Sequence, residues 1–308
     1  MELAQGFHLT YCTHIHPARG YEAVVENLRT HTSALRRRLA PDRPFGVGLR
    51  LSAAESETLL RGDRLQRFKA FLAESGLYVF TINGFPYGPF HGEPVKASVF
   101  APDWREEARL SYTLRLIAIL SELLPPGMEG GISTVPLSFK GWVAPFDRRA
   151  VERMVDQLTE AVAVMACLAR QKGQVLHLDL EPEPGSLIET VDEAARFFEH
   201  WLLPIGAPLL ARRLRVSEPA ARDLFREHLR LCLDACHLAV GYEDPARALQ
   251  RLDRAGMRVG KVQLSSALKA ELPNGQTHRS QLALALAPFA ESTYMHQVME
   301  RRLDGRIC

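Results

Sequence analysis

Two spacings of apolar residues alternate along this chain. Short runs with an apolar residue at every second position, or at nearly every position, predict β-strands, whereas apolar positions three and four residues apart predict amphipathic helices. Eight segments have the strand pattern: 7–16, 45–52, 77–83, 131–136, 175–181, 229–236, 259–264 and 293–298. The clearest helical spacing forms an apolar face from Val151, Met154, Val155, Leu158, Val162, Met165 and Ala169. Strands and helices are therefore expected to alternate through the chain.

Local signals mark where several of these helices begin and end. Thr190 and Glu193 have the spacing of a capping box, and Asp244-Pro245 has the form of an N-cap followed by the first helical residue. Glycine is the residue that most readily ends a helix, because it adopts a left-handed conformation without strain. Gly76, Gly173 and Gly256 stand where the periodic stretches stop.

Repeated strand-then-helix units with short connections predict a parallel sheet. About eight such units in 308 residues favour a closed (β/α)8 TIM barrel, which typically takes roughly 250 residues plus insertions. A dinucleotide-binding fold needs a glycine-rich turn after its first strand, and residues 14–20 do not supply one. No linker rich in Gly, Ser or Pro divides the chain, so a single domain over residues 1–308 is expected.

The segment 175–185 carries the strongest chemical signal. Because side chains alternate along a strand, His177, Asp179 and Glu181 share one face while leucines occupy the other. Pro182 and Pro184 cannot continue a central strand, which places Glu181 at its carboxyl end, where α/β proteins bind ligands. His177 and Asp179 lie deeper, and we expect them to form a satisfied polar layer inside the barrel.

The segment 229–237 repeats this design, because it ends an apolar strand on Asp234 and places His237 three residues later. Strand ends converge at one mouth of a barrel, so Glu181 and Asp234 are expected to share a cation site. Each acid could instead cap the next helix or pair with an arginine. Other polar residues expected at the same mouth are His14, His16, Asn83, His91, Lys96, Gln263 and His296.

These residues can be sorted by the chemistry of their side chains. Carboxylate and amide oxygens suit Mg²⁺ or Mn²⁺, and imidazoles shift the preference toward Mn²⁺, Co²⁺ or Zn²⁺. We therefore predict a divalent metal ion held by Glu181, Asp234, Gln263 and His296, and catalytic roles for Glu181 and His237. The predicted substrate-binding residues are His16, Asn83, His91 and Lys96.

A cation beside a carboxylate supports proton transfer next to a carbonyl group, the chemistry of isomerases and epimerases. His14 and His16 also form a His-x-His pair, as in amidohydrolase barrels, which leaves metal-dependent hydrolysis as a weaker alternative. The aromatic-rich segment 85–90 leaves open a third hypothesis, a noncatalytic escort that holds a small molecule.

The composition of the chain limits the kinds of partner and the cellular compartment that can be expected. The 38 basic and 36 acidic residues leave a net charge of +2, which gives no global attraction to nucleic acid. Apolar runs stop well short of the ~18 residues that a membrane-spanning helix needs, so no membrane insertion is expected. Five cysteines without a Cys-x-x-Cys pair, and an N-terminus without a signal-peptide pattern, predict a cytoplasmic protein. The expected partner is a small-molecule metabolite, as the predicted site at the strand ends implies.

Several strings resemble the metabolite traffic protein EboE family, within the xylose-isomerase-like TIM barrels. The resembling segments are 11–17 (YCTHIHP), 48–52 (GLRLS), 81–92 (TINGFPYGPFHG), 131–136 (GISTVP), 180–184 (LEPEP) and 261–268 (KVQLSSAL). The resemblance implies a barrel with a divalent-metal site on Glu181, Asp234 and His237. Gln263 stands where the sugar epimerases commonly have a histidine.

The same resemblance implies traffic of a small, prenylated metabolite, with other proteins of that pathway as partners. EboE-like chains continue beyond segment 294–298 with another histidine-bearing strand and a final strand that carries a glutamate. This sequence ends at Cys308. An xylose-isomerase-like barrel that is incomplete at its last strand is therefore expected.

Overall fold

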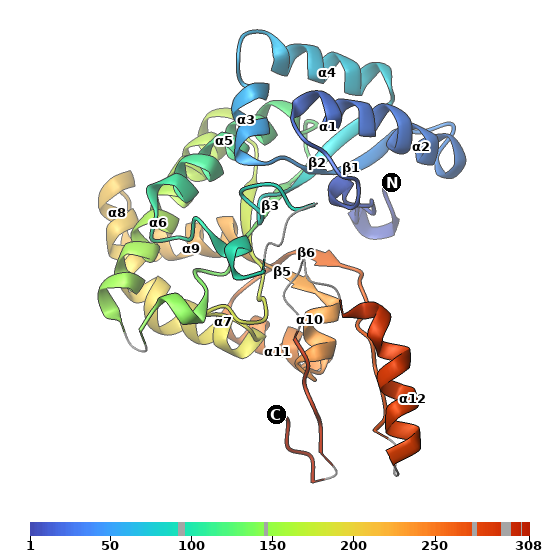
Figure 1. Cartoon of the computed structure of the whole chain (residues 1–308). Coiled ribbons are helices and arrows are strands. Elements are labelled where there is room, and N and C mark those ends of the chain that lie inside the picture. The colour runs from blue at the N-terminus through green and yellow to red at the C-terminus, as the bar shows by residue number, and fades with distance from the viewer. Residues whose placement is uncertain (92–95, 145–146, 273–275, 291–296, 303) are drawn as a thin grey trace.

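A computed structural model shows six parallel strands in one sheet, ordered β1-β2-β3-β4-β5-β6 (Figure 1). It describes residues 1–308 except 92–95, 145–146, 273–275, 291–296 and 303. The strands are β1 Phe45–Arg50, β2 Leu77–Asn83, β3 Gly130–Thr134, β4 Leu176–Leu180, β5 Leu229–Asp234 and β6 Val259–Gln263. The α-helices are α1 Tyr21–Asn27, α2 Ser33–Leu39, α3 Ala53–Leu59, α4 Arg64–Glu74, α5 Glu107–Leu123, α6 Arg148–Lys172, α7 Val191–Phe197, α8 Ala207–Leu214, α9 Glu218–His228, α10 Ala235–Val240, α11 Pro245–Ala255 and α12 Gln276–Leu286.

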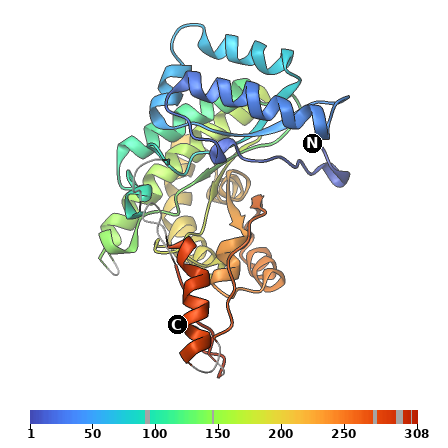
Figure 2. The same cartoon turned by 45° about the vertical axis from the view of Figure 1, so that its right-hand side comes forward.

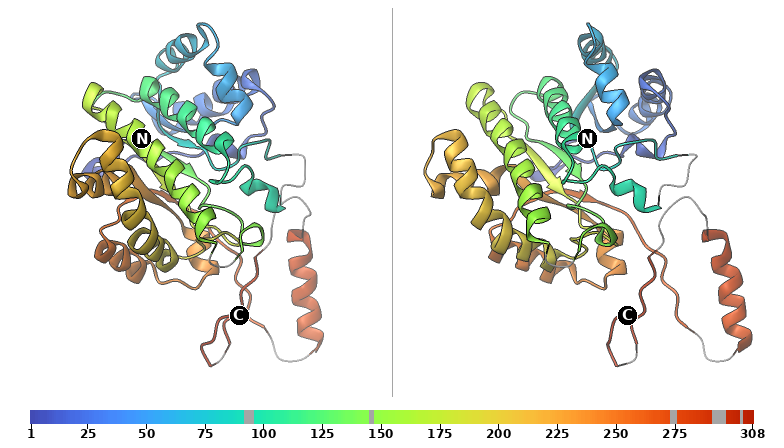
Figure 3. Two further views of the ribbon diagram at one scale, coloured as in Figure 1. Left: turned by 90° about the vertical axis from the view of Figure 1, so that its left-hand side faces the viewer. Right: turned by 60° about the vertical axis from the view of Figure 1, so that its left-hand side comes forward.

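The sheet is strongly curled, and helices cover its outer face (Figure 3). On the inner face Lys261 of β6 reaches β3, where its Nζ atom lies 3.3 Å from Ser133 Oγ. Gly131 and Gly260 leave room for a polar pair on β4, since a Cβ atom at either glycine would lie 2.6 Å or less from His177 or Asp179. His177 Nδ1 and Asp179 Oδ1 are 2.7 Å apart and both residues are buried, so they lie in the interior as predicted. The predicted polar layer is only partly satisfied, because Asp179 Oδ2 is buried without a hydrogen-bond partner.

Six of the eight predicted strands are present. The first prediction, segment 7–16, is wrong, because it contains a 3-10 turn, Thr13–Ile15, and only two isolated bridges, an antiparallel one between Glu2 and His8 and a parallel one between Cys12 and Gly48. The Thr13 hydroxyl accepts the hydrogen bond of the Arg50 amide at 3.0 Å, so a side chain replaces the main-chain partner that a strand would offer. Segment 293–298 falls mostly outside the described residues, and the eight-strand count is not confirmed.

The predicted helix boundaries are confirmed. The Thr190 and Glu193 capping box opens α7, and the Asp244 carboxylate accepts from the Arg247 amide at the start of α11. The three glycines predicted to end helices all have a positive φ angle: Gly76, Gly173 and Gly256. Helix α6 contains the predicted apolar face, whose central residues are completely buried.

The sheet ends at β6 in the part of the chain that the structure describes. Val262 and Leu264 lie along this edge with 55% and 80% of their surfaces exposed. Helix α12, the red helix that overlaps the orange ones in Figure 2, stands apart from the helices that cover the sheet when the molecule is seen as in Figure 3. Among the described residues, no helix combines the length and the apolar character that crossing a membrane requires.

Candidate metal centre

Glu181 follows β4 directly and is held by the neighbouring strand. Its amide donates to the Thr134 carbonyl at 3.1 Å, and only 6% of its surface is exposed. The Oε1 atom accepts from the Gln263 side chain at 2.5 Å, whereas Oε2 is buried and accepts no hydrogen bond. Burial raises the pKa of this carboxyl group, because the charged form has lost its water. An unpartnered buried oxygen of this kind is a strong acceptor for a proton or a cation.

Asp234 ends β5 and also begins α10. Its Oδ1 atom accepts from the Cys236 amide at 2.9 Å and from the Ser265 hydroxyl, so the residue does serve as a helix cap. Its other oxygen accepts from the Gln263 side chain at 3.1 Å. Helix capping therefore uses only one of the two oxygens of Asp234.

Gln263 brings the two predicted acids together. It aligns with Asp234 in the register of β5 and β6, and its Nε2 atom donates to both Glu181 and Asp234. An amide nitrogen is a donor without a lone pair for a cation. In this arrangement the side-chain amide of Gln263 lies between the two carboxylates and links them by hydrogen bonds.

His237 faces a carboxylate that the sequence analysis did not select, Glu183. The Nδ1 atom of His237 donates to the Pro182 carbonyl at 2.9 Å, which turns Nε2 toward Glu183 Oε2 at 3.1 Å. Two lone pairs at this distance repel each other unless a proton or a cation lies between them. The sequence signal for Glu183 was its place two residues after Glu181, beyond the proline that ends the strand.

The charges around this pair favour a bound cation. Burial raises the pKa of Glu183, since water no longer solvates its charge. Burial alone would lower the pKa of His237, but its hydrogen bond to Cys236 and the carboxylates of Glu183 and Asp234 outweigh that effect and raise it. Both groups therefore hold a proton more tightly than usual, and a metal ion that binds here replaces a proton.

Two sets of side chains have the donor chemistry and the spacing to hold a metal ion. Glu181, Glu183 and His237 place one donor atom each within 4.8 Å of one another, and so do Asp234, Cys236 and His237. Two carboxylates with one imidazole suit Mn²⁺, Co²⁺ or Zn²⁺. The unpartnered Glu181 oxygen makes the first set the better fit, with His237 Nε2 as a further ligand once its proton is displaced.

The remaining predicted residues lie elsewhere. Asn83 ends β2, and its side chain accepts from the Phe85 amide at 3.1 Å, so it shapes the following loop. Lys96 begins the 3-10 segment Lys96–Phe100 and is exposed. His16 and His91 belong to a separate pocket near the N-terminus. His296 lies outside the described residues.

His14 lies in the same N-terminal pocket as His16. Neither imidazole belongs to a group of potential metal ligands among the described residues. The hydrolase alternative, which required both to touch a metal ion, gains no support from this arrangement.

Comparisons with known proteins were made at three levels. No protein-family model matches the chain, and no curated protein matches it either. It is similar to the apo form of the 3-keto-D-glucoside 4-epimerase YcjR from E. coli, with 17% identity over 88% of this chain and 97% of that chain and a TM-score of 0.42.

Two further structures are similar at the same level. The probable 3-DHS dehydratase AsbF from Bacillus anthracis has 12% identity, covers 94% of this chain and 93% of its own, and gives a TM-score of 0.45. A D-allulose 3-epimerase from Methylomonas sp. has 13% identity, with 92% and 80% covered and a TM-score of 0.48. With identities of 17% or less and TM-scores below 0.5, these similarities assign no activity or ligand to this chain.

Proposed function

We propose that this protein is a divalent-metal-dependent isomerase or epimerase that acts on a small hydroxylated metabolite. The observation that carries the proposal is the buried Glu181 oxygen without a partner, in a cluster that also contains Glu183 and His237. The order of βα units and the sequence resemblance to xylose-isomerase-like barrels support the same interpretation. We also propose that the chain forms a closed eight-stranded barrel and a single domain over residues 1–308.

Each residue of the cluster has a distinct role in this proposal. Glu181 and His237 would hold the ion, because they offer the unpartnered oxygen and the imidazole lone pair. When bound, a divalent ion polarises a substrate oxygen and acidifies the neighbouring carbon. The Glu183 side chain is 23% exposed, against 6% for Glu181 as a whole, so it is the acid that a substrate can touch and that can accept and return a proton.

The resemblance to the EboE family supports a role in handling a metabolite of one traffic pathway, in the cytoplasm and beside other proteins of that pathway. Escort without catalysis has less support. The aromatic residues of segment 85–90 pack against the protein, since Phe85 is buried and the rings of Tyr87 and Phe90 lie 5.2 and 4.0 Å from those of Tyr112 and His14. They form a packed lid, not an open apolar wall.

Hydrogen exchange tests the proposed reaction. Purified protein with Mn²⁺ or Mg²⁺ and a panel of ketoses in deuterated water should incorporate deuterium next to the carbonyl, and a chelator should stop it. Glu183→Gln should slow the incorporation, while the exposed Glu152→Gln on α6 should not. Binding of a sugar without exchange would support the escort. The absence of both binding and exchange would contradict both functions.

Replacing Gln263 with histidine should tighten binding of Zn²⁺ or Mn²⁺. An imidazole would place a lone pair between Glu181 and Asp234, where the amide now donates. The expected gain is about tenfold, or ~1.4 kcal/mol. Isothermal titration of the metal-free protein measures it. Gln263→Leu is the matched control, because it removes the same donor without adding a ligand, and equal affinities of the two variants would refute the explanation.

A further inference from the structure

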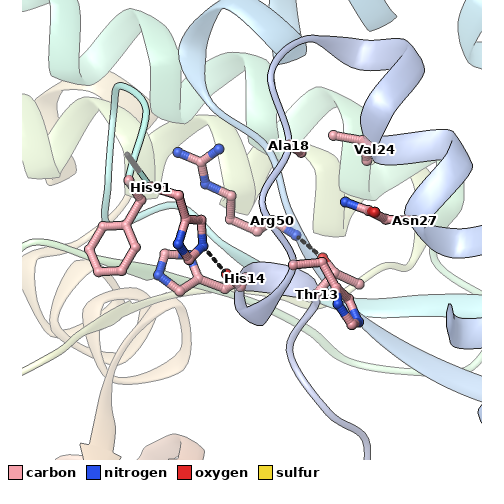
Figure 4. Close-up of a pocket in the computed structure, with 9 residues that line it drawn as sticks. Thr13, His14, Ala18, Val24, Asn27, Arg50 and His91 are labelled. Carbon is pink, nitrogen blue, oxygen red and sulfur yellow. Dashed lines mark hydrogen bonds between the residues drawn. The ribbon is translucent and has the colours of Figure 1, made fainter. Parts of the chain in front are cut away.

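The pocket that contains His14 and His16 lies at the end of β1, beside the N-terminal segment (Figure 4). Its enclosed part is small, about 20 Å³ measured as the space open to the centre of a water-sized sphere, and it lies within about 350 Å³ of unfilled space that is partly open to solvent. Its polar walls come from the 3-10 turn Thr13–Ile15, from Arg50 at the end of β1, and from His91, whose Nε2 atom donates to the His14 carbonyl at 2.7 Å. Segments far apart in sequence therefore build one polar cavity.

Three nitrogen atoms of this pocket are buried without a hydrogen-bond partner: Arg50 Nε, His14 Nδ1 and His16 Nε2. Arg50 has only 7% of its surface exposed, and its other nitrogens contact Glu55 and the Gly88 carbonyl. Leaving a buried polar atom without a partner costs about 1–3 kcal/mol. An arginine Nε can only donate, so the missing partner of Arg50 is a hydrogen-bond acceptor.

The surroundings of the pocket are electropositive. Burial, followed by the charges of Arg50, His91 and Lys261, lowers the pKa of His14 to about 3. Glu55 forms a buried ion pair with Arg50, in which Oε2 lies 3.3 Å from Nη1, and the same oxygen also accepts from the Ser52 amide at 2.7 Å as part of the capping box of α3. This pair leaves Arg50 Nε without a partner. An acceptor that enters this pocket is therefore favoured when it is negatively charged.

The pocket and the candidate metal centre both lie at the carboxyl-terminal ends of the strands. Arg50 aligns with Asn83 in the register of β1 and β2, and Asn83 aligns with Ser133 of β3. Lys261 crosses the inner face to Ser133, and its charge acts on both His14 and Glu181. One small molecule with two ends could therefore contact both regions.

We propose that His14, His16 and Arg50 form a subsite for one anionic group, a phosphate or a carboxylate, of the metabolite whose other end contacts Glu183. The substrate class is then a hydroxy-carbonyl compound that carries such a group. The assignment of the anion to a substrate rests on the proposed function, whereas the subsite itself rests on the three unpartnered nitrogens.

Titration of the full chain with inorganic phosphate, and separately with malonate, tests the subsite in the presence of a metal chelator. Calorimetry should show saturable binding of at least one anion below 50 mM, and the imidazole proton signals of His14 and His16 should shift in NMR spectra. Arg50→Lys removes Nε as a donor, and His16→Asn removes a half-buried imidazole whose ring stacks on that of His31 at 4.1 Å. Each should weaken binding at least tenfold.

The exposed His200→Asn is the matched control and should bind like the wild type. Preference for phosphate or for malonate tells which anion the substrate carries, and either result supports the subsite. Absence of binding to both, or binding that the folded Arg50→Lys and His16→Asn variants retain in full, would overturn it. Glu181→Gln should keep anion binding while it loses metal binding, so failure of the metal proposal and failure of the subsite give different results.

Discussion

Glu181→Gln is expected to weaken binding of Mn²⁺ or Zn²⁺ at least 100-fold and, at the same time, to stabilise the metal-free protein. The carboxylate is buried with one oxygen unpartnered, so its charge is costly without a cation and is needed with one. Glutamine has nearly the same shape, and its oxygen can keep the bond from Gln263. A 100-fold loss corresponds to ~2.7 kcal/mol of binding free energy, and the gain in folding should be about 1 kcal/mol.

Calorimetric metal titration measures the first effect, and urea unfolding in a chelator measures the second. Glu152→Gln, on an exposed face of α6, should change neither quantity. A Glu181 whose role was structural would give the opposite signs, with lower stability in the metal-free protein and unchanged affinity for the ion. The two measurements together separate a ligand from a packing residue.

The sequence predicts those parts of this fold that local chemistry decides. Capping by Thr190 and Asp244, and the termination of α6 at Gly173, depend on residues within one helical turn. Strands β1 to β5 are largely buried, as expected for apolar segments of a parallel sheet that is covered on both faces. The first predicted strand does not form, because the Arg50 amide of β1 donates its hydrogen bond to the Thr13 side chain and not to a main-chain carbonyl. This contact depends on tertiary packing, which the spacing of apolar residues does not encode.

The candidate site also contains some residues that local sequence predicts and others that depend on tertiary packing. Glu181 and Asp234 are predictable, because a strand followed by a proline or a helix fixes where their backbones end. Two features of the site are not predictable. Gln263 acts as a donor because two carboxylates face it, and Glu183 joins the site because the turn after Pro182 folds back toward His237. Both depend on packing between strands distant in sequence.

Arg109 of α5 is a buried charge that the sequence gives no sign of, and it fixes the loop that follows β2. It is completely buried, and none of the ion pairs found among the described residues involves it. Its Nε atom donates to the Pro102 carbonyl at 2.8 Å, and Nη1 donates to the carbonyls of Gly84 and Phe85 at 2.9 and 3.0 Å. Burial lowers the pKa of its guanidinium to about 10, and the rings of Tyr87 and Tyr112 lie within 6 Å.

Arg109→Met should therefore lower the free energy of unfolding by about 3–5 kcal/mol, because three carbonyls lose their donor and the aromatic rings lose their cation. Urea unfolding measures the loss. Arg109→Lys keeps the charge but lacks the planar fork that reaches both sides of the loop, so an intermediate loss is expected. The exposed Arg149→Met on α6 should cost nothing measurable. A loss below 1 kcal/mol in Arg109→Met would mean that water replaces the guanidinium as the partner of the Gly84, Phe85 and Pro102 carbonyls.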